Sequence, residues 1–350
     1  MSAGIAYPAG RYLAASTPDP EAEMTSSQRA GSMAVTVAVL TYRRNRELAT
    51  LLPALTAELA SAPPGSSVLV VDNSPDAGAR EVVEAAGPGL RYACESIPGI
   101  AAARNRALDL SATDLLVFID DDEMPVAGWL GQLLATFHDE PVAAVVGPVV
   151  SHFTKPLEAF VEAGGFFRRR RLPTGTAVTV AATNNLLLDL SVVRRLGLRF
   201  DDRFGLTGGS DYLFTSSLHR AGGRMVWCDE AVVLDLVPAH RCTPGWVLRR
   251  AFRTGNGTAV IEVTLAGPGA AGWGMRLTQL RVGLLRVAVG TVECAGGLLT
   301  RSVRLRATGA RHVARGAGLS VGAVGRLYAE YRRPLDGPPS QGAAPLGVVA

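Results

Sequence analysis

Short apolar runs alternate with helical patterns through the first two thirds of the chain. Residues 34–40 read AVTVAVL, residues 67–72 read SVLVVD and residues 115–120 read LLVFID, with a shorter run at 90–96. The segments between them predict helices that begin near Arg46 and cover residues 79–86 and 99–111. Apolar strands separated by helices indicate a parallel sheet covered on both faces. We therefore predict an α/β fold with a mostly parallel sheet flanked by helices.

The pattern becomes less regular after residue 140. Residues 142–150 predict one strand, and residues 177–190 predict another with Asn184 and Asn185 near its middle. Residues 166–174 contain four consecutive arginines and predict a mobile basic loop. The pattern of residues 224–238 is typical of a hairpin, and a helix is expected over residues 243–252. From about residue 273 the chain is basic, with apolar residues at helical spacing, which predicts a helical C-terminal region.

Four consecutive acids follow the strand at 115–120, namely Asp120, Asp121, Asp122 and Glu123. Two like charges about 4 Å apart repel by roughly 1 kcal/mol in water and by more near a protein surface. A divalent cation relieves this repulsion, and oxygen ligands with retained water suit Mg²⁺ or Mn²⁺ bridging to a diphosphate. A solvated acidic turn is the alternative. Because ligands bind at the carboxyl ends of parallel strands, the position favours a binding site.

Polar residues also follow the neighbouring strands. Asp72 ends the second strand and is a candidate acceptor for a base or sugar hydroxyl, or else opens an Asx turn. Thr41 and Arg43, after the first strand, reach the same crevice or serve as a helix cap and a solvated arginine. Arg104 lies on the helix predicted at 99–111, where it pairs with the acids or a phosphate, or stays on the surface.

A glycine-rich stretch, TGGSD, ends in Asp211 at the start of a predicted helix. Its carboxylate is a candidate general base, with an N-terminal cap as the alternative. Arg250 and Arg253 lie three positions apart on one helix, where they can clamp a pyrophosphate or face a membrane. His240 is a lone histidine, for which a structural role is favoured over metal ligation.

Composition narrows the classes of function. The net charge is +4, which is too small to indicate nucleic-acid binding. The four cysteines are scattered and no secretory leader is evident, which favours a reducing cytoplasm. No segment has the roughly 18 uninterrupted apolar residues of a membrane span, because Arg286 and Glu293 interrupt residues 282–300.

Four parts are expected along the chain. Residues 1–32 read as a disordered extension, with Met33 as a candidate true start. Residues 33–257 form the catalytic domain, residues 258–335 a helical region and residues 336–350 a flexible tail. The apolar, arginine-bearing helices of the third part can lie on an anionic membrane surface or pack against the catalytic domain or a second subunit as a homodimer.

The chain resembles the family 2 glycosyltransferases, which are inverting enzymes with the GT-A fold, a Rossmann-like nucleotide-diphospho-sugar transferase fold. The resemblance covers residues 35–257 and rests on an ordered set of blocks: VAVLTYRRN, VLVVDNSP, GIAAARNRAL, LLVFIDDDE, ATNNLLL, TGGSDYLF and WVLRRAF. It implies a nucleoside-diphosphate-sugar donor, a small-molecule, glycan or lipid-linked acceptor and a Mg²⁺ or Mn²⁺ cofactor. The implied location is the cytoplasm, including its membrane surface.

The resemblance also implies roles for residues at matching positions. Asp211 matches the catalytic base, and Asp120 and Asp122 match the metal-binding pair, with Asp122 the direct ligand. The residues that would bind the nucleotide sugar are Thr41, Arg43, Asp72, Arg104, Asp120, Asp121, Asn184, Gly208, Gly209, Arg250 and Arg253. Asp121 and Glu123 are also interpreted as tuning the local field or as solvated.

One departure from the family pattern leaves alternatives open. The family has an acid before the base, whereas this chain has Ser210. A sugar-nucleotide-binding protein without transferase activity therefore stays a hypothesis. A sugar-nucleotidyltransferase is disfavoured because LTYRRNRE lacks the expected glycines, and an Asp-nucleophile phosphatase because the acids follow the fourth strand.

Overall fold

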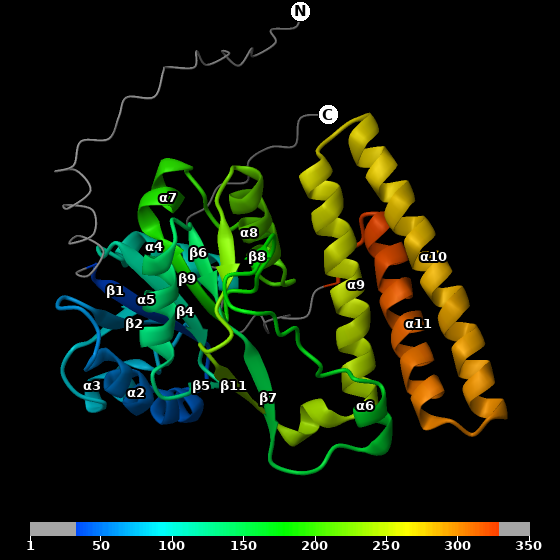
Figure 1. Cartoon of the computed structure of the whole chain (residues 1–350), viewed down its shortest axis with the longest axis horizontal. Coiled ribbons are helices and arrows are strands. Elements are labelled where there is room, and N and C mark those ends of the chain that lie inside the picture. The colour runs from blue at the N-terminus through cyan, green and yellow to red at the C-terminus, as the bar shows by residue number, and fades with distance from the viewer. Residues whose placement is uncertain (1–32, 329–350) are drawn as a thin grey trace, which may run out of the picture.

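A computed structural model describes residues 33–328, and Figure 1 shows the arrangement. The expected disorder of residues 1–32, the tail at 336–350 and the last residues of the 258–335 region lie outside the described residues. The strands are β1 (Val35–Thr41), β2 (Ser67–Asp72), β3 (Leu90–Cys94), β4 (Leu115–Asp120), β5 (Glu123–Pro125), β6 (Ala144–Val146), β7 (Val149–Phe153), β8 (Ala177–Val178), β9 (Asn185–Asp189), β10 (Met225–Trp227) and β11 (Val233–Val237). The helices are α2 (Asn45–Leu59), α3 (Arg80–Ala85), α4 (Ile100–Leu110), α5 (Trp129–Asp139), α6 (Ala159–Ala163), α7 (Leu190–Arg195), α8 (Ser210–Arg220), α9 (Pro244–Ala266), α10 (Ala270–Leu299) and α11 (Val303–Ala323), with short 3-10 helices η1 (Asp202–Phe204) and η2 (Ala239–Cys242).

The main sheet has eight strands in the order β3-β2-β1-β4-β9-β6-β10-β8. Strands β1 to β4 are parallel, whereas β9 runs antiparallel to both β4 and β6, and β8 antiparallel to β10. This confirms the mostly parallel sheet. Register places Thr41 opposite Asp72 and Leu40 opposite Asp120, so the carboxyl ends of β1, β2 and β4 meet at one edge.

Apolar side chains cover both faces of this sheet, as the continuous apolar strands predict. On one face, α2 and α5 contribute Leu48, Leu55 and Trp129 to the core. On the other face, α4, α7 and α8 contribute residues such as Ala103 and Phe214. The described core is therefore a three-layer sandwich, whose polar strand ends stay available for a site.

Three expectations about the middle of the chain are wrong. The runs at 142–150 and 177–190 each divide into two strands, and β10 and β11 belong to different sheets instead of forming a hairpin. The break at Gly147 brings the backbone against the side chain of Asn185, whose Nδ2 would lie 2.3 Å from a Cβ there. Asn185 is buried at the start of β9, where its Nδ2 donates to the carbonyls of Pro148 and Ala231 and its Oδ1 accepts from Trp129. These bonds satisfy a polar side chain that the sequence alone makes unexpected in a core strand.

The C-terminal region is helical, as expected. Helices α9, α10 and α11 lie side by side, with α9 nearest the sheet and α10 outermost (Figure 1). The helix expected at 243–252 extends to Ala266, so α9 passes without a break through residue 257, where the catalytic domain is expected to end. Within residues 33–328, α10 is the one helix whose length and apolarity would let it cross a membrane.

Candidate active site

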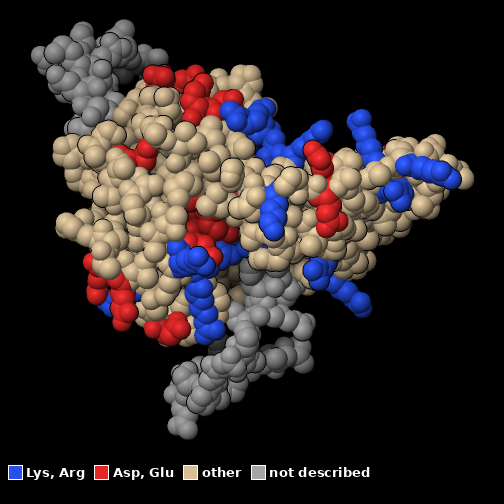
Figure 2. Space-filling model, turned by 90° about the horizontal axis from the view of Figure 1, so that it is seen from below, with Lys and Arg blue, Asp and Glu red and all other residues tan. Residues whose placement is uncertain are grey.

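A cavity of about 1100 Å³ opens at the carboxyl ends of β1 and β4. Its lining also includes the start of α8, residues of α9 from Trp246 to Ile261, the loop before β9 and residues of the loop at 166–171. Small-molecule pockets have volumes of roughly 300–1,000 Å³, so this cavity can hold a ligand as large as a nucleotide sugar. Figure 2 shows acidic groups in a hollow of this face, with basic side chains around it.

The acid cluster is partly neutralised by arginines. Asp121 accepts a hydrogen bond from the Thr41 hydroxyl at 2.8 Å and pairs with Arg44 at 2.8 Å. Asp122 pairs with the same Arg44 at 2.9 Å and with Arg241 at 3.1 Å. Arg44 and Arg241 thus hold two of the four acids.

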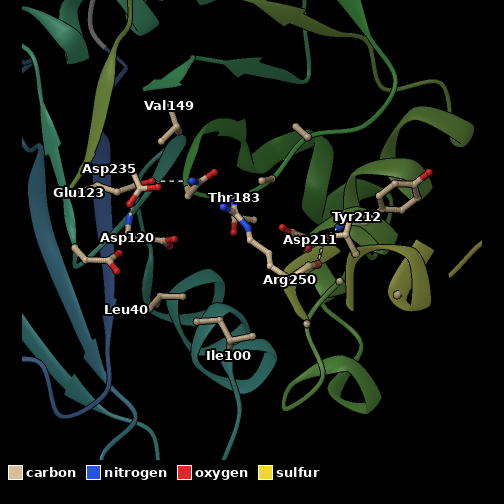
Figure 3. Close-up of a pocket in the computed structure, with 18 of the residues that line it drawn as sticks. Leu40, Ile100, Asp120, Glu123, Val149, Thr183, Asp211, Tyr212, Asp235 and Arg250 are labelled. Carbon is tan, nitrogen blue, oxygen red and sulfur yellow. Dashed lines mark hydrogen bonds between the residues drawn. The ribbon is translucent and has the colours of Figure 1, made fainter. Parts of the chain in front are cut away.

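Asp120 differs from Asp121 and Asp122, because no described cation forms an ion pair with its carboxylate. Burial, together with the nearby Asp122, raises its pKa from 3.8 to about 7, although Arg104 acts in the opposite direction. Asp120 faces the cavity in Figure 3. A carboxylate with so high a pKa at a cavity wall is one that a bound cation would stabilise.

Glu123 is buried and not solvated. Its Oε1 accepts from the Asn184 amide at 2.7 Å, and its Oε2 accepts from the backbone N–H of Asp120 at 3.1 Å. Burial raises its pKa well above the usual range. Asp121 is also buried, so the interpretation of these two acids as solvated is wrong. Through Asn184 and Glu123, the loop before β9 is tied to the end of β4.

Asp211 lies in the first turn of α8, across the cavity from Asp120 (Figure 3). Gly208 and Gly209 precede it with φ values of 80° and 95°, a backbone conformation that favours glycine. The N-cap residue of α8 is Gly209, and Asp211 accepts from the adjacent Tyr212 N–H at 2.9 Å. Asp211 is therefore not the cap of this helix, and its carboxylate lies at the positive end of the helix dipole.

Ser210, beside Asp211, is fully buried and accepts a hydrogen bond from Arg104 at 2.6 Å. The guanidinium of Arg104 also lies over the ring of Phe200, and its Nε has no hydrogen-bond partner among the described atoms. Arg104 thus reaches from α4 to the start of α8, and its charge also acts on Asp120.

The opposite wall is basic. Arg250 and Arg253 line the cavity from α9, and Arg169 lines it from the loop at 166–171, where it pairs with Asp235. Burial lowers the pKa of Arg250 to about 10, and the neighbouring Arg169 and Arg253 contribute to this shift. The Arg250 guanidinium also lies near the rings of Phe167 and Trp246. Arg250 stays cationic at neutral pH and is placed to attract an anion.

The donor set fits a hard divalent cation in part. Within the described part of the chain, no three His, Cys, Asp or Glu side chains form a ready-made metal site. Asp120 and Asp122 supply two carboxylates, and Mg²⁺ commonly takes one or two carboxylates and completes its shell with phosphate oxygens and water. Both arginines pair with Oδ2 of Asp122, so a cation would share this carboxylate with Arg44 and Arg241.

The cavity brings together most of the residues expected from the sequence. Its lining includes Thr41, Arg104, Asp120, Asp121, Asp122, Asn184, Gly208, Gly209, Asp211, Arg250, Arg253 and the more doubtful His240. Asp72 and Arg43 do not line it. Asp72 is fully buried and accepts from Ser74 N, Ala79 N and the Tyr92 hydroxyl, which is the turn geometry considered as its alternative. Arg43 lines a separate surface hollow beside Ser74.

Other residues that line the cavity escaped the sequence analysis, among them Arg44, Asn73, Arg169, Tyr212, Asp235 and Arg241. Arg44 directly follows Arg43, and the choice between them depends on a turn in which Arg43 has φ 53°. Asp235 and Arg241 enter through β11 and η2, which lie beside β5 and the acid cluster only in the folded chain. No spacing in the sequence predicts that contact.

Comparison with known proteins agrees with this geometry. Residues 36–197 match the model of glycosyl transferase family 2. The chain is 34% identical over 226 residues to the succinoglycan biosynthesis protein ExoM of Rhizobium meliloti strain 1021, which covers 63% of this chain and 73% of that protein. It is 28% identical over 195 residues to the glycosyltransferase AglE of Haloferax volcanii, covering 54% of this chain and 62% of that protein.

Among solved structures, the chain is similar to the mannosyltransferase PcManGT from Pyrobaculum calidifontis, in complex with GDP-Man and Mn²⁺. The TM-score is 0.55 at 18% identity, and the match covers 84% of this chain and 93% of that one. At this identity the likeness concerns the fold.

Proposed function

This chain belongs to glycosyltransferase family 2 and has the GT-A fold, and we propose that it transfers a sugar with inversion from a nucleoside-diphosphate sugar to a hydroxyl or amine acceptor. Asp211 is the general base in this proposal, and Asp120 and Asp122 hold Mg²⁺ or Mn²⁺. The observation that carries it is the position of Asp211 at the helix start facing Asp120, with Arg250 between them (Figure 3).

The donor would lie along the line from the sheet edge to α8. Thr41, Arg104 and Asp121 border the nucleoside end, together with Arg44 and Asn73. The diphosphate would lie between Asp120 and the arginines Arg250 and Arg253. Asn184, Gly208 and Gly209 then border the donor sugar. We keep Arg43 and Asp72 as predicted nucleotide contacts, although reaching the cavity would require both side chains to change position.

The reaction follows from these positions. Asp211 accepts the proton of the acceptor hydroxyl or amine while the acceptor heteroatom attacks the anomeric carbon. The bond from this carbon to the diphosphate oxygen breaks on the opposite face, and its electron pair stays on the diphosphate. Arg250 and Arg253 stabilise this negative charge. A bound divalent cation would supply further charge stabilisation at the diphosphate. Because one displacement suffices, no protein nucleophile is needed.

The proposal extends to the location, the acceptor and the partners of the enzyme. The four cysteines form no disulfide, which supports a cytoplasmic location. A relative named for succinoglycan biosynthesis supports a glycan acceptor and a role in glycan biosynthesis. A lipid-linked acceptor and a role in cell-envelope glycan or natural-product biosynthesis also belong to the proposal. The proposal also includes a contact of the C-terminal helices, either with a membrane surface or with a second copy of the chain in a homodimer.

A donor screen tests the proposal. Purified protein with Mg²⁺ or Mn²⁺ is incubated with UDP-, GDP- and dTDP-sugars, and the released nucleoside diphosphate and the anomeric configuration of any product are measured. We expect one donor class to turn over and the product to be inverted. Asp211→Asn should bind the donor but not transfer, whereas Asp202→Asn, an exposed acid of η1 outside the cavity, should match the wild type. Binding of a nucleotide sugar without any turnover in the wild type would favour the non-catalytic alternative.

A further inference from the structure

Helix α10 packs against α11 through glycines. Gly283, Gly290 and Gly297 are its buried glycines along this contact, spaced seven residues apart. A Cβ on Gly290 would lie 2.5 Å from the carbonyl oxygen of Gly309, and one on Gly283 would lie 2.7 Å from that of Gly316. The two backbones therefore approach closely, and the large side chains of α10 are directed elsewhere.

The opposite side of α10 is a long exposed apolar face. It carries nine large apolar residues that are exposed: Trp273, Leu277, Val282, Leu284, Leu285, Val289, Val292, Leu298 and Leu299. The exposed fraction reaches 74% for Trp273, 73% for Val292 and 87% for Leu299. In Figure 2 the part of the molecule that projects to the right is mostly tan, with separate basic and acidic side chains. A contiguous apolar surface of this kind marks an interaction site.

The charges of the C-terminal helices indicate which kind of partner would cover the apolar face of α10. Residues 270–326 contain nine arginines and a single acid, Glu293. The carboxylate of Glu293 is hydrogen-bonded to His312 at 2.7 Å, and one acid cannot balance nine arginines. Two copies placed face to face would bring two such arginine-rich regions together without counter-charge. An anionic lipid surface offers both an apolar layer and the missing negative charge.

The same charges oppose insertion across the bilayer. Helix α11 is attached along α10 and carries Arg304, Arg306, Arg311 and Arg315. An arginine at the centre of a bilayer is strongly unfavourable, and a spanning α10 would carry α11 and its arginines with it. Arg281, an exposed arginine on the apolar face, has a side chain long enough to reach the headgroups while its stem stays in the apolar layer.

We propose that α10 lies flat on an anionic membrane, with its face from Trp273 to Leu299 at the level of the acyl chains. Helix α9 links this face to the cavity, because it packs on both neighbouring helices and also carries Arg250 and Arg253. The three-helix bundle would thus hold the active site close to the lipid surface. This position suits an acceptor that is attached to a lipid. Membrane binding does not depend on the proposed transfer reaction, so the two can fail separately.

Vesicle co-sedimentation of the full chain tests this. We expect the protein to pellet with vesicles containing phosphatidylglycerol and to stay in the supernatant with pure phosphatidylcholine, with binding weakened by salt. The triple variant Leu285→Gln, Val292→Gln, Leu299→Gln should reduce partitioning more than about tenfold. Gln keeps helix propensity, and an unchanged circular dichroism melt would show that the variant is folded.

The controls separate the alternatives. Ile97→Gln removes an exposed apolar residue, 58% exposed, on the catalytic domain and should bind like the wild type. Arg301→Gln with Arg304→Gln should lower binding to anionic vesicles while leaving the apolar face intact. A wild-type protein that does not pellet with anionic vesicles would overturn the proposal. A dimer in sedimentation velocity that the triple variant dissociates, without vesicle binding, would assign the face to a second copy.

Discussion

The two walls of the cavity carry opposite charges, and they differ in how far neighbouring side chains neutralise those charges. The sheet wall gathers Asp120, Asp121, Asp122 and Glu123. Arg44 and Arg241 neutralise Asp121 and Asp122, whereas Glu123 accepts a hydrogen bond from the neutral amide of Asn184. The helical wall places Arg250 among other arginines instead. Among the described residues, Asp120 on one wall and Arg250 on the other both face the cavity without an ion-pair partner. A cation and a diphosphate, bound together, would complete both.

The first prediction concerns Asp211, which belongs to neither wall and stands at the start of α8. Asp211→Asn keeps the size of the side chain and its bond from Tyr212 but cannot accept the acceptor proton. General-base catalysis contributes about 10²–10⁴-fold, so we expect kcat to fall by that much. Donor affinity, measured by calorimetry, should change less than about threefold. Unchanged kcat would remove Asp211 from the reaction.

The second prediction tests the unpaired acid. Asp120→Asn should lower metal-dependent turnover by about 10²-fold or more, since it removes a proposed ligand of the cation. Asp114→Asn, at the amino end of the same strand and exposed, is the matched control. Activity at the wild-type level over a metal titration would exclude Asp120 from the metal site.

The same substitution should affect stability in the opposite direction. The folded-state pKa of Asp120 is raised from 3.8 to about 7, so its ionisation opposes folding. This destabilisation is absent below about pH 4, grows as the pH rises toward 7 and is constant above. Without metal at pH 8, Asp120→Asn should therefore melt at a higher temperature than the wild type. Its free energy of unfolding should be larger by about 1 kcal/mol or more. The two melting temperatures should converge at pH 4, and a variant less stable at pH 8 would contradict the assignment.

The contrast between the walls also explains what the sequence could predict. The strands β1 to β4 and the acids at the end of β4 could be predicted, because a buried parallel strand is a continuous apolar run and its polar end is local. The partners of these acids could not. Arg241 reaches Asp122 from 119 positions further along the chain, and Asp235 adjoins Glu123 only because β11 pairs with β5.

The sequence also could not predict which single residue at a turn reaches the cavity. Arg43 and Arg44 are adjacent, and the φ of 53° at Arg43 helps to decide which of them reaches the acids. Asp72 has the same local pattern as Asp120, a carboxylate at the end of an apolar strand, but hydrogen bonds from its own turn and Tyr92 occupy its oxygens. The tertiary contacts, and not the spacing, distinguish the two.

The third prediction tests the unpaired cation. Arg250→Gln should weaken binding of the donor and of the nucleoside diphosphate by about 10–100-fold, because a charge-assisted hydrogen bond in a buried site contributes more than a neutral one. Arg249→Gln removes the adjacent arginine, which is exposed and outside the cavity, and should leave binding unchanged. Equal losses in both variants would indicate a general effect of net charge instead of a specific contact.

The smallest effect is expected where α9 contacts the turn before Asp211. A Cβ on Gly209 would lie 2.6 Å from Cδ1 of Ile261 in α9, whereas one on Gly208 would meet nothing within 4 Å. Both glycines have positive φ, so backbone strain destabilises either alanine variant by about 1–2 kcal/mol. In Gly209→Ala the steric clash with Ile261 adds to this strain. We expect Gly209→Ala to melt lower than Gly208→Ala, and Gly209→Ala with Ile261→Ala to recover part of that gap in a double-mutant cycle. Equal melting of the two glycine variants would mean that α9 does not press on this turn, and the helical wall would then act on Asp211 through its charge alone.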